Sequence, residues 1–404
     1  MRGLTARVRA VPRGDKIVAL KSKAILVSGS FYDLFVELWK IREATQKIID
    51  ALWCLDRIPS LNQVHKMFYN LLRQEGFRAH QAKQIYKYAL SLVKSAKANR
   101  GSKPTLRKLS ARLDKYDASI DFNTWTVTVK LRDKIFRLKL LHRREYLEKF
   151  KGKRWYELVV KLKSRAEIEV VIYFHFEYNP YTPKRILALD INLKQIVLFD
   201  GKHIRRIKTR YPEALKLKRQ AEEVQKKQRY SWRRNKKLLE QVSSRHRRSA
   251  RIVIDWSRKK AKEIVLKARK LHAIIVLEDL TGLWHNASQR SSDLADKLSR
   301  FAYRKFINAI VTKCIEYNVP VVFVDPRGTS SICPKCGNEL EYIYRLGYCR
   351  SCGFIADRDS IGVLNIYKLV ISFLNLQPRC LGRRGTRPMT DEARPKGGTS
   401  QMRG

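Results

Sequence analysis

Apolar residues in the first quarter of the chain recur at the spacing of helices. Over residues 31–99, leucine and isoleucine return every three or four positions, which places them on one face of a helix. Pro59 and Gly76 interrupt this pattern, and Ser60 is a residue type that caps the start of a helix. We therefore expect residues 31–99 to form a bundle of roughly three helices.

Apolar and polar residues then alternate, which is the period of a β-strand. Near Trp125, valines alternate with threonines, and similar alternation follows along the chain. The predicted strands cover residues 125–129, 134–141, 155–163 and 167–176. We expect residues 1–30 and 100–180 to form one β-rich domain, a small barrel or a sandwich, with an early strand at 17–27 and with the helical bundle inserted into it.

From residue 181 onward, strands and helices alternate. The strands are expected at 186–190, 196–199, 203–207, 273–278 and 319–324, and helices at 294–317 and 360–374. This order is that of an RNase H-like α/β fold, which we expect over residues 181–330 and 354–376. The whole chain is thus predicted to be an α+β multidomain protein. Residues 377–404 lack periodicity and are expected to be a disordered tail.

The charge of the chain narrows the class of partner. Lys and Arg number 86 against 37 Asp and Glu, which gives a net charge of +49. Such an excess repels itself in a folded protein, and a polyanion relieves the repulsion. Nucleic acid fits best, with an anionic membrane surface or a ribosomal setting as the alternatives.

No apolar run in the sequence is long enough to cross a bilayer, and the basic start lacks the apolar stretch of a signal peptide. An organelle transit peptide is a less favoured alternative. Seven cysteines without a secretion signal indicate a reducing compartment. We expect a cytoplasmic, nucleoid-associated protein of a prokaryote, with no membrane partner.

Residues 202–270 form a basic segment in which Lys and Arg far outnumber Asp and Glu. A run of one charge is most often a solvated helical surface. Here Tyr230 and Trp232 lie among the positive charges, and their rings could stack on bases. We therefore predict that this segment contacts nucleic acid. The candidate residues are Tyr230, Trp232, Arg233, Arg234, Arg245, Arg247, Arg248 and Arg251.

Four cysteines form two matching pairs, each with two intervening residues and a following glycine. The pairs are Cys333 with Cys336 and Cys349 with Cys352. This spacing lets both sulfur atoms of a pair face one ion, and glycine permits the tight turn that follows. A redox pair, the alternative, would not need a matching second pair. We expect residues 331–353 to be an insert that binds one structural Zn²⁺ ion through four thiolates.

Two carboxylates end predicted buried strands, and two more precede the last helix. Asp190 and Glu278 are the first two, and Asp357 and Asp359 the others. Such residues can be helix caps or ion-pair partners of the abundant Lys and Arg. Three converging carboxylates would repel one another, and two Mg²⁺ ions would neutralise them in a site that hydrolyses phosphodiester bonds. The residues alone support a metal-dependent nuclease and structural ion pairs about equally.

The order of these motifs resembles that of the TnpB family, transposon-encoded relatives of the type V CRISPR effector nucleases. The motifs are Leu189-Asp190-Ile191-Asn192, Leu277-Glu278-Asp279-Leu280, the run from Asp325 to Gly337, the second cysteine pair, Asp357-Arg358-Asp359 and Asn365-Ile366. The resemblance implies an RNA-guided DNA endonuclease with a RuvC-type nuclease domain. Its front part would be a β-barrel wedge domain with an inserted recognition bundle.

The resemblance also implies the roles of individual residues and partners. Asp190, Glu278 and Asp359 match the three catalytic carboxylates, which would bind two Mg²⁺ or Mn²⁺ ions, and the four paired cysteines match the zinc ligands. The implied partners are a guide RNA from the transposon end and double-stranded target DNA, cut beside a short adjacent motif. No small-molecule substrate is expected.

Some positions depart from the family pattern. Ile361 stands where the family usually has asparagine, and Ala188 and Asn192 stand where glycine is common. The carboxylates are unchanged, but metal affinity or helix packing could differ. The alternative function is therefore a catalytically weak RNA-guided DNA-binding regulator or transposition accessory protein. A stand-alone junction-resolving nuclease is a further alternative.

Overall fold

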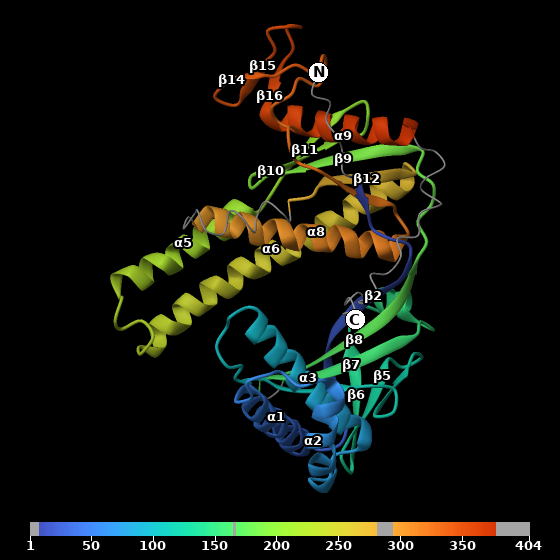
Figure 1. The fold of residues 1–404 in the computed structure, drawn as a ribbon, viewed down its shortest axis with the longest axis vertical. Coiled ribbons are helices and arrows are strands. Elements are labelled where there is room, and N and C mark those ends of the chain that lie inside the picture. Colours follow the sequence, from blue (N-terminus) through green and yellow to red (C-terminus); the bar gives the residue numbers. More distant parts are fainter. Residues whose placement is uncertain (1–7, 165–166, 281–293, 377–404) are drawn as a thin grey trace, which may run out of the picture. The chain divides into compact units, whose positions relative to one another are not determined.

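The computed structural model describes residues 8–164, 167–280 and 294–376, and the chain divides into two compact units (Figure 1). The bundle unit is Pro12–Pro180. The cysteine unit combines Met1–Val11 with Tyr181–Gly404. The tail expected at 377–404 lies outside the described residues.

The helices of the bundle unit confirm the predicted helical region. They are α1 (Phe31–Trp53), α2 (Leu61–Gln74) and α3 (Ala79–Ala98). Ser60 caps α2 as expected, because its hydroxyl accepts a hydrogen bond from the backbone N–H of Gln63 at 3.3 Å. The recurring apolar residues form the interior, where Leu34 and Leu38 are fully buried.

A seven-stranded sheet completes the bundle unit, in the order β3-β7-β8-β2-β6-β5-β4. The bounds are β2 Gly14–Ser28, β3 Leu109–Leu113, β4 Ala118–Asp121, β5 Thr126–Leu131, β6 Lys134–Leu141, β7 Trp155–Ser164 and β8 Glu167–Tyr178. The early strand joins this sheet as expected, since β2 pairs with β6 on one side and β8 on the other. Within the described residues no ladder joins β3 to β4, so the expected barrel is not closed by hydrogen-bonded strands.

The main sheet of the cysteine unit has six strands in the order β1-β13-β12-β9-β10-β11. The bounds are β1 Val8–Ala10, β9 Arg185–Ile191, β10 Gln195–Phe199, β11 Ile204–Lys208, β12 Ala273–Glu278 and β13 Val321–Val324. Strand β12 runs parallel to both β9 and β13, and the other pairs are antiparallel. The strands from β9 to β13 confirm the order predicted from the apolar runs.

Helices cover both faces of this sheet (Figure 1). The helices are α5 Tyr211–Lys227, α6 Lys236–Lys270, α8 Leu294–Tyr317 and α9 Arg358–Leu376. Alternate residues of each strand face opposite sides. Leu187 and Leu189 therefore pack in the core with α5, α6 and α8, whereas Ile186 and Ala188 pack in the core with α9.

One strand lies in a different unit from the one we expected. Val8–Ala10 was assigned to the β-rich domain with the rest of residues 1–30, but β1 pairs with β13 at the edge of the cysteine-unit sheet. Arg9 holds this strand in place, because its guanidinium lies 2.9 Å from Asp279 and stacks on the ring of Phe323. The segment is too short to show a strand period, so its sequence carries no signal for its partner.

The cysteine pairs lie in a small three-stranded sheet, β14-β15-β16, which we call the ribbon. Its strands are β14 Glu341–Ile343, β15 Leu346–Tyr348 and β16 Ile355–Asp357, and α9 begins directly after β16. A hairpin formed by β14 and β15 connects the two cysteine pairs. Among the described helices of both units, none is long and apolar enough to cross a membrane.

Candidate active site

Two of the predicted carboxylates lie side by side at the ends of neighbouring parallel strands. Ala188 on β9 pairs with Val276 on β12, and two residues further along each strand come Asp190 and Glu278. A step of two residues keeps a side chain on the same face of a sheet. Ala188 and Val276 both pack in the α9 core, so both carboxylates also face α9.

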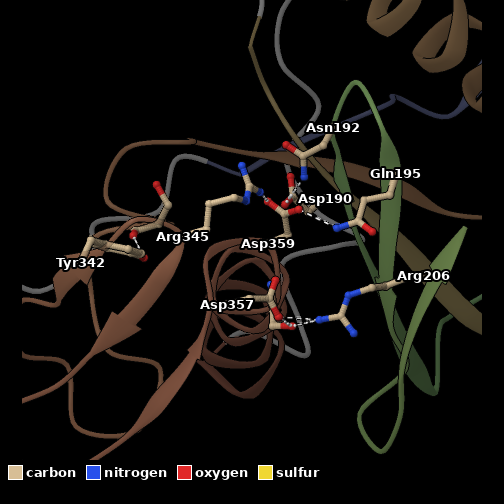
Figure 2. A network of polar contacts seen from close by, with 10 residues as sticks. Asp190, Asn192, Gln195, Arg206, Tyr342, Arg345, Asp357 and Asp359 are labelled. Atoms are coloured by element: carbon tan, nitrogen blue, oxygen red, sulfur yellow. Dashed lines mark hydrogen bonds and ion pairs between the residues drawn. The ribbon is translucent and has the colours of Figure 1, made fainter. Parts of the chain in front are cut away.

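The third carboxylate, Asp359, lies in the first turn of α9 and is 5% exposed. Figure 2 shows Asp190 and Asp359 pointing toward one another from the sheet and the helix. Asp190 lies against the first turns of α9, since a Cβ atom added at Gly362, one turn along from Asp359, would lie 3.2 Å from Oδ2 of Asp190. The structure therefore brings Asp190, Glu278 and Asp359 together on one face of the sheet.

Asp357 has a different environment, although it is only two residues from Asp359. Its carboxylate accepts hydrogen bonds from Arg206 on β11 and from the hydroxyl of Ser360. In Figure 2 it lies below the pair formed by Asp190 and Asp359. The geometry thus agrees with the choice of Asp359 over Asp357 as the third candidate carboxylate.

Burial and mutual repulsion shift the carboxylates toward their neutral form. Burial, the charge of Glu278 and, to a smaller extent, that of Asp359 raise the pKa of Asp190 to about 7. Asn192 partly opposes this, because its amide donates a hydrogen bond to Asp190 Oδ2 at 2.9 Å. Burial also raises the pKa of Glu278, and the hydroxyl of Thr329, which donates to Oε1 at 2.7 Å, lowers it again in part.

This donor set suits a hard divalent cation. Mg²⁺ and Mn²⁺ prefer carboxylate oxygens, and a bound cation lowers the cost of burying like charges together. Asp190, Glu278 and Asp359 are the residues that could hold such ions. The raised pKa of Asp190 agrees with this, since buried carboxylates that repel one another are stabilised in their charged form by a nearby cation.

We expect the stability of the protein in Mg²⁺-free buffer to depend on pH through Asp190. Its pKa is about 7 in the folded protein against 3.8 for an unshifted aspartate. The folded protein therefore holds the proton more tightly, and its stability falls as the pH rises from about 4 to about 7. Asp190→Asn should lose this part of the slope, which thermal unfolding at a series of pH values will measure. Asp255→Asn, an exposed position on α6, is the control and should keep the wild-type slope; equal slopes for all three proteins would contradict the prediction.

The four paired cysteines form one cluster. Their sulfur atoms all lie within 4.8 Å of one another, with 3.6 Å from Cys333 to Cys352 and 3.4 Å from Cys336 to Cys349. Tetrahedral zinc with Zn–S bonds of about 2.3 Å requires sulfur separations of about 3.8 Å. The cluster is therefore compatible with a structural zinc ion.

The turn after each cysteine pair has the geometry that its glycine predicted. Gly337 and Gly353 have φ angles of +83° and +70°, in the region that favours glycine. Their backbone N–H groups donate to the carbonyls of Cys333 and Cys349 at 3.0 and 2.9 Å. Each pair thus closes into the same tight knuckle.

The ribbon is packed directly on the first turns of α9. Ile361 is fully buried and packs against Cys333 and Cys349. The side-chain amide of Asn365 donates to the carbonyls of Thr329 and Ile332 at 2.8 and 2.7 Å. Ile361, which departs from the pattern of the family that the sequence resembles, therefore forms the apolar contact that joins the ribbon to the helix bearing Asp359.

Two residues that the sequence did not single out contact Asp359. Arg345, in the turn between β14 and β15, forms an ion pair with one carboxylate oxygen, and Gln195 at the start of β10 donates to the other at 2.7 Å (Figure 2). Thr329 has a comparable role at Glu278, which it contacts through its hydroxyl. Arg345 lies between the two cysteine pairs, and Thr329 lies in the motif that precedes them. Their closeness in sequence to the cysteines was therefore the only feature that could have pointed to either residue.

The candidate nucleic-acid residues differ in their surroundings. Tyr230 and Trp232 lie in the turn between α5 and α6, where Tyr230 is 84% exposed and Arg233 stacks on Trp232. Arg245 donates to the carbonyl of Gln220, and Arg247 pairs with Glu240, so both have protein partners. The other arginines of the set are exposed and have no ion pair among the described residues, namely Arg233, Arg234, Arg248 and Arg251.

Comparison with known proteins agrees with this architecture. Residues 303–366 match the family model described as Cas12f1-like, TNB domain. A TnpB-like protein of Methanocaldococcus jannaschii is 30% identical over 239 residues, which cover 56% of this chain and 83% of that protein. The CRISPR-associated endodeoxyribonuclease Cas12f1 of Sulfoacidibacillus thermotolerans is 30% identical over 106 residues, 24% of this chain and 23% of that protein.

A solved structure extends the likeness to the fold. The cryo-EM structure of a Cas12f1-sgRNA-target DNA complex has a TM-score of 0.56 and 13% identity, and the match covers 87% of this chain and 99% of that chain. The two units and the four-cysteine ribbon thus make up an α+β multidomain fold that is similar to the solved Cas12f1 structure. The chain belongs to the TnpB family, which is related to the type V effectors.

Proposed function

We propose that the protein is an RNA-guided DNA endonuclease and that Asp190, Glu278 and Asp359 are its catalytic carboxylates. The observation that carries the proposal is their convergence from β9, β12 and α9 on one face of the sheet, with the pKa of Asp190 raised by burial and by the other two charges. In this proposal the six-stranded sheet and its helices are an RNase H-like, RuvC-type domain. The ribbon is its zinc-binding insert.

Two Mg²⁺ or Mn²⁺ ions bound by these carboxylates would activate a water molecule and neutralise the charge on the leaving oxygen of a phosphodiester. The chain's own residues prepare the site for them. Arg345 and Gln195 fix the orientation of Asp359, Asn192 fixes Asp190, and Thr329 fixes Glu278. Arg345 is therefore a positioning residue, and it makes the site dependent on the ribbon.

A guide RNA and double-stranded target DNA are the proposed partners. The solved Cas12f1 structure contains both kinds of nucleic acid, and this chain has a net charge of +49 to bind their phosphates. At the α5–α6 turn, the exposed ring of Tyr230 and the half-buried Trp232, on which Arg233 stacks, offer aromatic surface and positive charge for the same purpose. Base pairing to the guide, and not side-chain contacts, would select the target.

The test is to purify the protein from cells that carry its transposon and to sequence the RNA that accompanies it. We expect one RNA species whose end matches the target, and cleavage of matching DNA only when Mg²⁺ or Mn²⁺ is present. DNA with a scrambled target is the control. If no RNA accompanies the protein, or if DNA binding is unchanged after RNase treatment, the proposal of a guide RNA is wrong. If the RNA-loaded protein binds the matching DNA but does not cut it with either metal, the protein is a DNA-binding protein and not a nuclease.

A further inference from the structure

An ion pair lies next to Glu278, on the face of the six-stranded sheet opposite the carboxylates. Asp279 follows Glu278 directly, so the two side chains leave the chain on opposite faces of the sheet. The carboxylate of Asp279 contacts Arg9 of β1, because its Oδ2 atom accepts a hydrogen bond from Nε at 3.0 Å and lies 2.9 Å from Nη2. Arg9 therefore holds the residue after Glu278 through both of these nitrogen atoms.

Arg9 reaches Asp279 across an intervening strand. Strand β1 pairs with β13, and β13 pairs with β12, so the side chain of Arg9 spans the width of β13. Phe323 is the register partner of Arg9 on β13, and its ring centroid lies 4.7 Å from the guanidinium carbon. This stacking directs the guanidinium along the sheet toward the end of β12.

The backbone at Glu278 is held in the same region. The N–H of Asp279 donates to the carbonyl of Val324 at 2.8 Å, and the hydroxyl of Tyr303 on α8 donates to the carbonyl of Glu278. Phe323, on which Arg9 stacks, belongs to the core that contains α8, whereas Val324 belongs to the core that contains α9. The carboxylate of Glu278 thus projects toward α9 from a backbone that Tyr303 and Arg9 hold from the other face.

We propose that Arg9 is a positioning residue for Glu278 and, through it, for the metal ions of the carboxylate centre. The inference rests on the proposed nuclease function, and it adds a residue from β1, far in sequence from the other residues of the site. Arg9 fixes the end of β12, from which Glu278 projects. It also neutralises Asp279, whose charge would otherwise attract a cation to the wrong face of the sheet. Replacing a residue that orients a metal ligand typically changes metal affinity or activity by roughly 10–100-fold.

A positioning role and a purely structural role for Arg9 predict different results. The Arg9 side chain is 59% exposed, and exposed ion pairs contribute little to the stability of a protein. Arg9→Ala should therefore lower the melting temperature by no more than about 3 °C. It should nevertheless raise the Mn²⁺ concentration that half-saturates the carboxylate centre roughly tenfold.

The test measures Mn²⁺ binding to the full chain with its RNA by electron paramagnetic resonance, in the absence of DNA. Asp190→Ala provides the blank for Mn²⁺ bound elsewhere on the protein or on the RNA. Arg9→Ala should weaken binding roughly tenfold, and Arg9→Lys, which keeps the charge but not the planar guanidinium, should weaken it less. The same variants should raise the Mn²⁺ requirement for cleavage and leave the affinity for matching DNA unchanged.

Asp279→Ala tests the contact itself. If Arg9 acts through Asp279, the double variant Arg9→Ala, Asp279→Ala should bind Mn²⁺ no more weakly than Asp279→Ala alone, because two changes to one contact are not additive. Arg144→Ala is the charge control, since it removes an exposed arginine that pairs with Glu148 in the bundle unit, and it should bind Mn²⁺ as the wild type does. Additive losses in the double variant, or an equal loss in Arg144→Ala, would overturn the proposal.

Two further outcomes separate the role of Arg9 from other roles and from the nuclease activity. If Arg9→Ala weakens DNA binding and leaves Mn²⁺ binding unchanged, Arg9 contacts nucleic acid and its assignment as a positioning residue is wrong. If Mn²⁺ binding responds as expected but the RNA-loaded wild type does not cut matching DNA, Arg9 is supported as a positioning residue of a metal site and the proposed nuclease activity fails.

Discussion

Replacing Asp190 with alanine should abolish DNA cleavage and leave guide-dependent DNA binding in place. The variant removes a carboxylate from the end of β9, where burial, the charge of Glu278 and, to a smaller extent, that of Asp359 raise its pKa to about 7. Loss of a metal-binding carboxylate removes several kcal/mol of transition-state stabilisation, and each 1.4 kcal/mol or so corresponds to a factor of ten. We therefore expect the single-turnover rate to fall on the order of 10³-fold or more. A gel assay with labelled target DNA measures cleavage, and a filter-binding assay measures binding.

A pair of neighbouring variants provides the control for this prediction. Asp359→Ala should be as inactive as Asp190→Ala, because both carboxylates face the same site. Asp357→Ala should retain cleavage, since its carboxylate contacts Arg206 and Ser360 instead. If Asp190→Ala still cleaved DNA, the proposed site would be wrong. If Asp357→Ala lost cleavage and Asp359→Ala retained it, Asp357 would be the third catalytic carboxylate in place of Asp359.

The second large effect concerns the cysteine cluster. Cys333→Ser should release the zinc ion, lower the melting temperature by at least several degrees and also stop cleavage. A structural zinc ion contributes on the order of 10 kcal/mol of apparent binding free energy in small domains, so the ribbon should not fold without it. Cleavage should stop because Arg345, which orients Asp359, lies in that ribbon, and Ile361 packs against Cys333. Metal analysis, thermal unfolding and the cleavage assay give the three measurements.

Cys54→Ser is the matched control for this variant, because Cys54 is exposed and lies outside the cluster. It should keep the zinc ion, the melting temperature and the activity of the wild type. If Cys333→Ser lost zinc but cut DNA at the wild-type rate, the ribbon would not position Asp359. If it retained one zinc ion per chain, the assignment of the ligands would be wrong.

The parts of the fold with a strong period were predictable from the sequence. The strand at 273–278 and the helix at 294–317 were predicted with the bounds that β12 and α8 have. A buried strand is a continuous apolar run, and a long helix repeats its apolar period several times, so both are visible in the sequence. The cysteine cluster was predictable for a different reason. Each cysteine pair with its following glycine is a short local pattern, so the metal ligands could be recognised without knowing any contact between distant residues.

The rest depended on contacts between residues far apart in the chain. Asp190 and Glu278 ended apolar runs, but only the register of β9 with β12 shows that they lie side by side. Arg345 is one of very many arginines, and nothing in its neighbourhood in the sequence connects it with Asp359. Val8–Ala10 and the short strands β3 and β4 were misassigned or missed because a few residues do not display a period.

The position of β1 has a consequence for the covalent connection of the two units. From β1 in the cysteine-unit sheet, the chain leaves this unit at Val11, passes through all of Pro12–Pro180 and returns to it at Tyr181. The bundle unit is thus an insertion, and two separate links of chain join it to the rest of the protein. A protease that cuts one link leaves the units tethered by the other, and an engineered deletion of the bundle unit would have to connect the end of β1 directly to the start of β9.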